Sequence, residues 1–184
     1  MKKKSIAFVG LAVAAVAGAY LAFGGFAGQG TKPAASADVK RIVADYAAGV
    51  LKAQSASVTS ERLVVTGSDG KETAYDLPKD EFFVSVAPYA NATHPCAIHN
   101  LVSCRGEMAN ASFDVRIVNE AGDVVLDESL RAGPNGFVDL WLPRNGTFAI
   151  TVERDGKSAT SAITTYPGDD TCVTTLRLTE NKSV

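Results

Sequence analysis

Both histidines and two of the three cysteines of this chain lie within eleven consecutive residues. The cluster holds His94, Cys96, His99 and Cys104, and the third cysteine, Cys172, follows much later in the chain. Thiolates are soft donors and imidazoles are intermediate, so this combination favours Cu(I), Zn(II) or an iron–sulfur cluster over Mg²⁺ or Ca²⁺. We therefore expect a single soft-metal site that collects all the thiols and imidazoles of the chain.

The metal alternatives differ in the ligands that they need. Cu(I) accepts low coordination numbers, so two or three of the cysteines with an optional histidine would suffice. Structural Zn(II) usually takes four ligands, which Cys96, Cys104, Cys172 and one histidine could supply. The separation of Cys96 and Cys104 is longer than the C-x₂₋₄-C pairs of zinc fingers, so the spacing does not match a standard finger, and the identity of the metal is left open by the spacing. Met108 is a conceivable thioether ligand, but packing explains it more simply.

Other uses of the thiols are also open. In an oxidising compartment two nearby cysteines pair by default, so Cys96–Cys104, or a bond from either one to Cys172, is the structural alternative. Such a bond leaves one thiol and both histidines unexplained. The chain has no C-x-x-C motif, which argues against a thioredoxin-type redox dyad. Cys–His hydrolysis with Asn100 as the orienting residue has no further support in the sequence.

The N-terminal segment indicates export. Lys2, Lys3 and Lys4 precede an uncharged run at 6–26, and the small residues Ala35-Ser36-Ala37 then fit a cleavage signal. Since the run is long enough to span a bilayer, a retained anchor is the alternative. We assign residues 1–37 to a signal peptide or membrane anchor with a small-residue spacer. Both interpretations place the rest of the chain outside the cytoplasm.

Charge excludes one class of partner. The chain has 18 basic and 20 acidic residues, and a net charge of −2 argues against a nucleic-acid binder. Residues 1–37 hold four lysines and no acidic residue, so the exported part is more acidic than the whole chain. Acidity is compatible with cation handling, although solubility is the simpler explanation.

The remaining pattern predicts an α+β fold. An apolar stripe at three- and four-residue spacing predicts a helix over 38–54, followed by a hairpin and a further strand at 82–86. We assign 38–92 to an N-terminal domain of one helix on a small antiparallel sheet. From residue 112 on, short runs between regular turn signals predict a β-sandwich-like domain, with Trp141 in its core. This second domain, 93–184, includes the Cys/His loop and places Cys172 at the start of a last strand over 172–178.

Several segments around these ligands resemble one known family. They are Phe83–Tyr89, Thr93–Cys96, Cys104–Glu107, Asn135–Val138, Trp141–Arg144 and Thr171–Leu176, together with His99. In this order they resemble the CueP family of periplasmic copper-binding proteins over about residues 60–178. The resemblance implies a copper-resistance protein that binds copper through Cys96, Cys104 and Cys172. It also makes the two histidines candidates to assist in binding the copper, with His99 ahead of His94.

The resemblance also implies what the copper is for. Such proteins carry copper to envelope cuproenzymes such as a superoxide dismutase and are linked to the reduction of Cu(II) to Cu(I). We therefore expect a Cu(I)-sequestering carrier rather than an enzyme. The alternatives are a thiol-dependent Cu(II) reductase, a disulfide-exchange protein, and a β module whose cysteines are structural. Sustained reduction would require an external thiol reductant as a partner. The N-terminal helical stretch is shorter than in the family. Whether the protein forms a homodimer is left open by the sequence.

Overall fold

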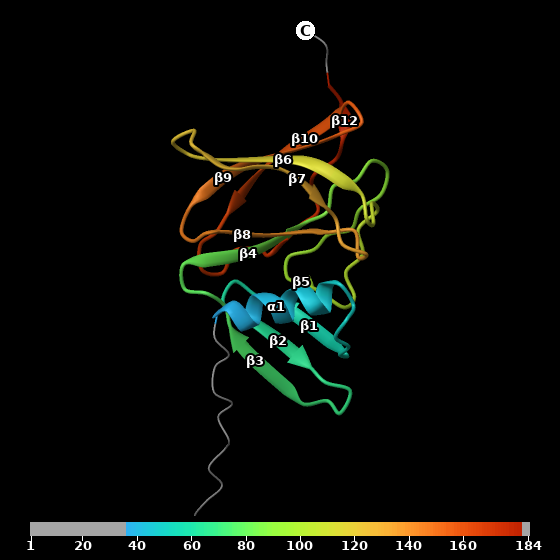
Figure 1. Cartoon of the computed structure of the whole chain (residues 1–184), viewed down its shortest axis with the longest axis vertical. Coiled ribbons are helices and arrows are strands. Elements are labelled where there is room, and N and C mark those ends of the chain that lie inside the picture. The colour runs from blue at the N-terminus through green and yellow to red at the C-terminus, as the bar shows by residue number, and fades with distance from the viewer. Residues whose placement is uncertain (1–35, 182–184) are drawn as a thin grey trace, which may run out of the picture. The chain divides into compact units, whose positions relative to one another are not determined.

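The structure, a computed structural model, describes residues 36–181 and is mostly β, with one α-helix among these residues (Figure 1). The helix is α1 (Ser36–Ala47). The strands are β1 (Ser55–Val58), β2 (Arg62–Thr66), β3 (Glu72–Asp76), β4 (Glu81–Val86), β5 (His99–Asn100), β6 (Ser112–Asn119), β7 (Val124–Arg131), β8 (Val138–Pro143), β9 (Thr147–Arg154), β10 (Lys157–Thr164), β11 (Cys172–Val173) and β12 (Thr179–Glu180). A helix combined with mainly antiparallel sheets confirms the predicted fold class at this level.

A three-stranded sheet in the order β11-β4-β8 has one large apolar core on each face. Alternate side chains of a strand point to opposite faces, so the even-numbered residues of β4 enter the larger core and Phe83 enters the smaller one. Ser85 is paired with Cys172 of β11 and with Asp139 of β8. These three residues therefore form a row on the same face as Phe83.

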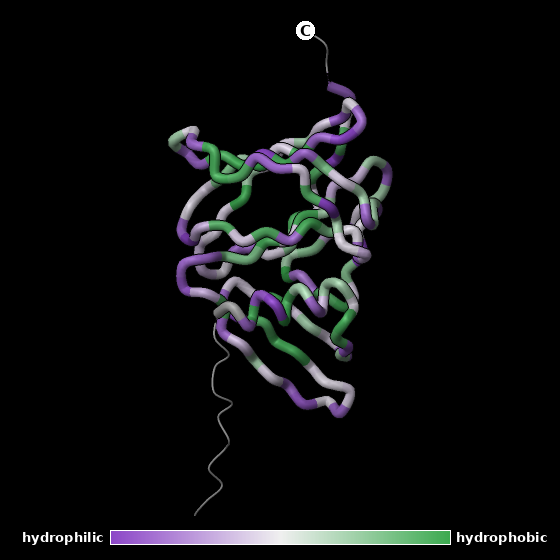
Figure 2. Tube along the Cα trace, in the orientation of Figure 1, coloured by the Kyte–Doolittle hydropathy of each residue, from purple (hydrophilic) through white to green (hydrophobic). Residues whose placement is uncertain are grey.

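The larger core lies between this sheet and a five-stranded sheet in the order β12-β10-β9-β6-β7. β6 shows why the sequence folds this way, since Phe113, Val115 and Ile117 are buried and alternate with exposed polar residues. The hydropathy of the chain shows the same alternation along these strands (Figure 2). Met108 packs against this core. The description of the two sheets as a β-sandwich stays a prediction.

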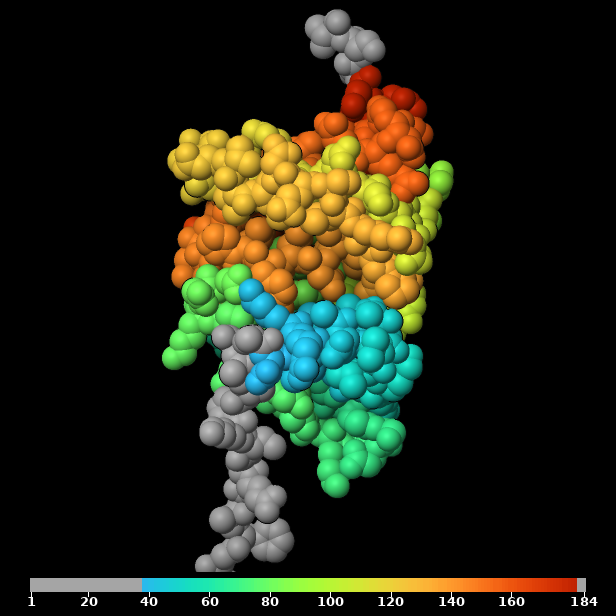
Figure 3. Space-filling view, in the orientation of Figure 1, coloured from blue at the N-terminus to red at the C-terminus, as the bar shows by residue number. Residues whose placement is uncertain are grey.

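The smaller core joins α1, the sheet β3-β2-β1-β5 and the second face of the central sheet. α1 contributes Val39 and Val43, and its outer side forms part of the surface in Figure 3. Trp141 packs against this core and is only partly buried, with the Lys40 ammonium 5.0 Å from its ring centroid. The same lysine forms an ion pair with Glu81.

The helix is shorter than the predicted 38–54. It ends at Ala47, and Gly49 then adopts a φ of +72°. The N–H groups of Gly49 and Val50 donate to the carbonyls of Tyr46 and Asp45, which is the Schellman arrangement that closes a helix on a left-handed residue. Val50 is consequently 70% exposed although it continues the apolar stripe.

The predicted last strand over 172–178 is also wrong. Only Cys172 and Val173 pair, in parallel with β4, and the chain then makes an isolated bridge from Arg177 to Tyr89 before β12. β5 likewise pairs with β1, and β4 pairs with β8, so strands from either side of residue 92 lie next to each other. The domain division at that residue stays a prediction.

The predicted signal peptide or anchor falls almost entirely outside the described residues. Within 36–181, no helix is long and apolar enough to cross a bilayer.

Candidate metal centre

The structure brings the predicted ligands into two overlapping sets. The outer set is His94, Cys96 and Cys104, and the inner set is His99, Cys104 and Cys172. Within each set the ligand atoms all lie within 4.8 Å of one another. Cys104 belongs to both sets. Cys96 and His94 come from the segment between β4 and β5, Cys104 from the turn after β5, and the inner residues from β5 and β11.

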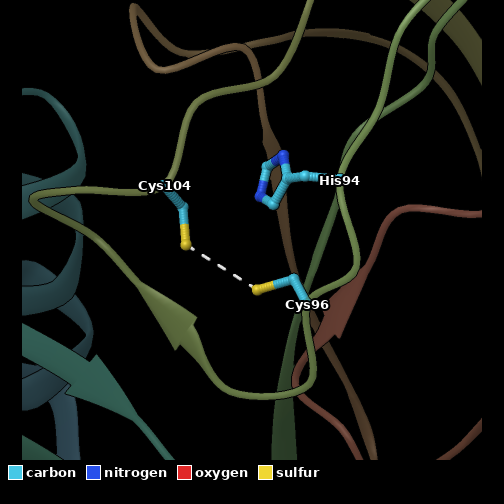
Figure 4. Close-up of side chains that lie close together, drawn as sticks. All are labelled: His94, Cys96 and Cys104. Atoms are coloured by element: carbon cyan, nitrogen blue, oxygen red, sulfur yellow. Dashed lines mark hydrogen bonds between the residues drawn. The ribbon is translucent and has the colours of Figure 1, made fainter.

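In the outer set, drawn in Figure 4, His94 is exposed and both cysteines are partly buried. The side chains of Cys96 and Cys104 point toward each other with their sulfurs 3.7 Å apart, and the His94 ring lies beside them. All three cysteines of the chain are free thiols, and this separation is well beyond the roughly 2.05 Å of a disulfide. A hollow opens over the set and is lined by His94, Pro95, Cys96, Ser103, Cys104 and Arg105.

The inner set is buried. His99 is 0% exposed and Cys172 is 3% exposed. His99 Nδ1 lies 3.6 Å from the sulfur of Cys172, and the His99 ring packs at 4.4 Å from the Phe137 ring centroid. The other ring nitrogen, Nε2, is buried and makes no hydrogen bond to any described residue. The ring thus presents Nδ1 to the sulfurs and holds Nε2 in the interior.

Thr171 fixes the inner set. The N–H of His99 donates to the Thr171 hydroxyl at 3.0 Å, and this hydroxyl donates to the Val58 carbonyl at 2.5 Å. The N–H groups of Thr171 and Cys172 both donate to the Ala97 carbonyl, at 2.9 and 3.1 Å. These bonds tie the segment before β5 to the start of β11, which places His99 beside Cys172.

Asn100 fixes Cys104. The N–H of Cys104 donates to the Asn100 carbonyl, and the N–H of Asn100 points back at the Cys104 sulfur at 3.4 Å. The Asn100 side-chain amide donates to the hydroxyls of Ser55 and Ser57, which anchors this turn on β1. Asn100 is therefore a positioning residue for a ligand, and its amide is bound to the sheet rather than oriented toward a Cys–His pair.

Glu107 fastens the segment that carries the outer ligands. Its carboxylate accepts hydrogen bonds from the N–H groups of Ala90, Asn91 and Ala92 and from the Asn91 side chain, at 2.8 to 3.1 Å. The backbone N–H groups of Asn91 and Ala92 contribute most to lowering the pKa of this carboxyl to about 2. The exposed loop before His94 is thus tied to the segment that follows Cys104.

A buried carboxyl lies in the same row as Cys172. The Ser85 hydroxyl donates to Asp139 at 2.5 Å, and burial raises the pKa of Asp139 while Ser85 and His99 oppose the rise. Sequence reasoning missed Ser85, Asp139, Thr171 and Glu107. Only Asp139 left a signal, because an acidic residue interrupts the otherwise apolar run of β8.

The three thiols differ in acidity. A hydrogen bond from the Cys172 thiol, supported by His99 and the N–H of Asn100, lowers the pKa of Cys104 well below its ordinary value. The same bond to Cys104, together with burial, raises the pKa of Cys172, and burial raises that of Cys96. Near neutral pH the negative charge therefore resides on Cys104, the residue common to both sets.

This acidity gives a testable pH dependence. A thiol with a lowered pKa stays ionised as the pH falls, so we expect iodoacetamide to alkylate Cys104 at a nearly constant rate from pH about 8 to about 5. A free thiol, with a pKa of about 8.5, loses about tenfold in rate per unit below that value. Mass spectrometry of the reduced protein identifies the modified residue. Cys104→Ser should abolish the constant component, and a rate at Cys104 that falls like that of free cysteine would contradict the assignment.

The same part of the chain matches known proteins. The family model for the periplasmic copper-binding protein CueP matches residues 43–177, which include all five ligand candidates. The chain belongs to the CueP family. The crystal structure of S.CueP is similar to this CueP-family chain, with 36% sequence identity and a TM-score of 0.72 over 77% of this chain and 89% of that chain. The search of curated protein sequences found no match to this chain.

Membership confirms two expectations. The resemblance of the cysteine-containing segments to CueP is confirmed, and the chain is a member of a periplasmic copper-binding family. The assignment of Cys96, Cys104, Cys172, His99 and His94 as ligands stays a prediction, although the structure places all five in the two sets described above.

Proposed function

We propose that this protein binds Cu(I) in the periplasm through its three cysteines, assisted by His99 and His94, and delivers it to envelope cuproenzymes such as a superoxide dismutase. The observation that carries the proposal is the convergence of three free thiols and two imidazoles at one place. Thiolates favour Cu(I), Zn(II) and iron–sulfur clusters, and membership of a copper-binding family favours Cu(I) among them. Binding by this cluster would keep copper from other reactions and so contribute to copper resistance.

The spacing of the donors fits a metal ion of this kind. Two sulfurs bound at about 2.3 Å to a tetrahedral Zn(II) lie about 3.8 Å apart, and a soft ion with bonds of similar length needs a similar spacing. The sulfurs of Cys96 and Cys104 are 3.7 Å apart. In the inner set His99 offers Nδ1 at 3.6 Å from the Cys172 sulfur, and Nε2 faces the interior. The described residues therefore fit the ion with little rearrangement.

Delivery is supported by the openness of the outer set. A recipient protein removes copper by offering its own ligands, so these must reach the ion. His94, Cys96 and Cys104 line a hollow at the surface, whereas His99 is fully buried. An incoming ligand would consequently approach from the side of Cys96 and Cys104. The recipient enzyme stays a prediction. The formation of a homodimer also stays a prediction.

Reduction of Cu(II) is a second candidate function, and the Cys96–Cys104 pair favours it. Two thiols that become a disulfide release two electrons and two protons, which reduces two Cu(II) ions to Cu(I) and gives the protons to solvent. The two sulfurs are 3.7 Å apart, and Cys104 is the more acidic one. An external thiol reductant would then have to restore the pair, and while oxidised the pair could not hold copper.

A competition titration tests the carrier function. The reduced protein is titrated under anaerobic conditions with Cu(I) against a chromophoric Cu(I) chelator, and separately with Zn(II). We expect one tightly bound Cu(I) per chain and much weaker Zn(II) binding. Tight one-to-one Zn(II) binding with weak Cu(I) binding would overturn the proposal.

Thiol counting separates the remaining alternatives. Three titratable thiols that Cu(I) protects support the carrier, and one disulfide with an inert thiol supports a structural module. Loss of two thiols on addition of two equivalents of Cu(II), with Cu(I) released, supports the reductase.

A further inference from the structure

We propose that the cluster holds Cu(I) in two alternative positions that share Cys104. Copper enters and leaves through an outer position on His94, Cys96 and Cys104, and it is retained in an inner position on His99, Cys104 and Cys172. This inference rests on the proposed function, since it assigns the outer position of the Cu(I) site to copper exchange and the inner position to copper storage.

The first argument is the division of the ligands. Two separate sets of three have their ligand atoms within 4.8 Å, and only Cys104 is common to them. A single three-cysteine position would instead treat Cys96 and Cys172 as equivalent ligands. They differ in exposure, because Cys172 is 3% exposed and Cys96 is only partly buried beside an open hollow.

The second argument is the difference in support. Two of the three inner ligands, His99 and Cys172, belong to strands, and Thr171 connects these strands to β1 through hydrogen bonds to His99 and Val58. Aromatic packing of Phe137 against His99 adds to this fixation. The outer ligands His94 and Cys96 lie in a segment without strand pairing, which is held by side-chain and backbone hydrogen bonds of Glu107, Thr93 and Ala97. A ligand set held ready loses less freedom on binding, so the inner position should bind more tightly.

The third argument is access. Cys172 also borders a second hollow, which it shares with Cys96, Asp169 and Asp170, yet its side chain is almost wholly buried there. His99 is fully buried. Copper can therefore reach the inner ligands most directly from Cys104, which is already within 4.8 Å of both.

The transfer step balances without an oxidant or reductant. Copper stays Cu(I) and keeps its bond to Cys104 throughout. Its bonds to Cys96 Sγ and His94 break while bonds to Cys172 Sγ and His99 Nδ1 form. Cys172 loses its thiol proton on becoming a ligand, and the released Cys96 thiolate takes up one proton. For delivery these changes are reversed, and the recipient's own ligands then replace Cys96 Sγ, Cys104 Sγ and His94 on the Cu(I) ion.

A matched pair of substitutions tests the two positions. Cys96→Ser and Cys172→Ser each remove one thiol, and Cu(I) affinity and the rate of copper removal by excess chelator are measured for both. For Cys172→Ser we expect an affinity loss of at least about tenfold with faster removal. For Cys96→Ser we expect a smaller affinity loss than for Cys172→Ser, but removal at least about tenfold slower than from the parent. Equal effects of the two substitutions on both quantities would overturn the two-position arrangement.

A third variant covers the case in which Cys172→Ser does not fold. His94→Ala changes an exposed side chain of the outer set only. It should slow copper removal, and an unchanged rate in both His94→Ala and Cys96→Ser would overturn the proposal. Failure of the parent protein to bind Cu(I) in the competition titration would instead refute the proposed function itself.

Discussion

Replacing Cys104 with serine should lower the Cu(I) affinity more than replacing either Cys96 or Cys172. Cys104 is the one ligand present in both sets, so its loss leaves two ligands in each. It is also the thiol whose pKa is lowered, and a thiolate binds Cu(I) without first losing a proton. Changes in residues around metal ligands already cost about 10–100-fold in affinity, so loss of the shared ligand should cost at least about 100-fold.

The measurement is a competition with a chromophoric Cu(I) chelator under anaerobic, reducing conditions. Ser103→Ala is the matched control, because Ser103 is an exposed neighbour that lines the same hollow. We expect this control to keep the parent affinity. If Cys104→Ser kept its affinity within about threefold while Cys96→Ser or Cys172→Ser lost it, Cys104 would not be the central ligand.

The sequence predicts a set of candidate ligands but not their arrangement in space. Thiols and imidazoles gathered around His99 indicate a soft-metal site because such residues are rarely grouped by chance. The position of Cys172 could not be derived from the pattern, because β11 and β5 have two residues each and show no alternation. Their pairing depends on Thr171 and on the register with Ser85, which only the folded chain sets.

The longer elements show where local patterns suffice. Buried and exposed residues alternate along β6, and the predicted hairpin appears as β2 and β3. The predicted helix is too long because the apolar stripe continues through Val50. In the structure the left-handed conformation of Gly49 ends the helix earlier. A local backbone preference outweighed hydrophobic periodicity here, and Val50 became exposed.

A contact between two glycines positions the segment that carries Cys104. The N–H of Gly106 donates to the Asn135 carbonyl at 2.7 Å, and Gly136 adopts a φ of +83° against Gly106. A Cβ atom on Gly136 would lie 2.5 Å from the Gly106 carbonyl oxygen and 2.7 Å from its carbonyl carbon. Both obstacles are backbone atoms, so a side chain here must displace the segment that follows Cys104.

Gly136→Ala should therefore destabilise the reduced, copper-free protein by about 2–5 kcal/mol, through strain at a positive φ and overpacking against backbone. The measurement is the free energy of unfolding in urea. Gly156→Ala is the matched control, since Gly156 has a φ of +76° but open space around its Cβ position, and only the strain of about 1–2 kcal/mol applies. Where Gly136→Ala still folds, its Cu(I) affinity should fall because Cys104 is displaced, whereas the control should keep the parent affinity. Equal destabilisation by the two substitutions would show that the contact with Gly106 does not position Cys104.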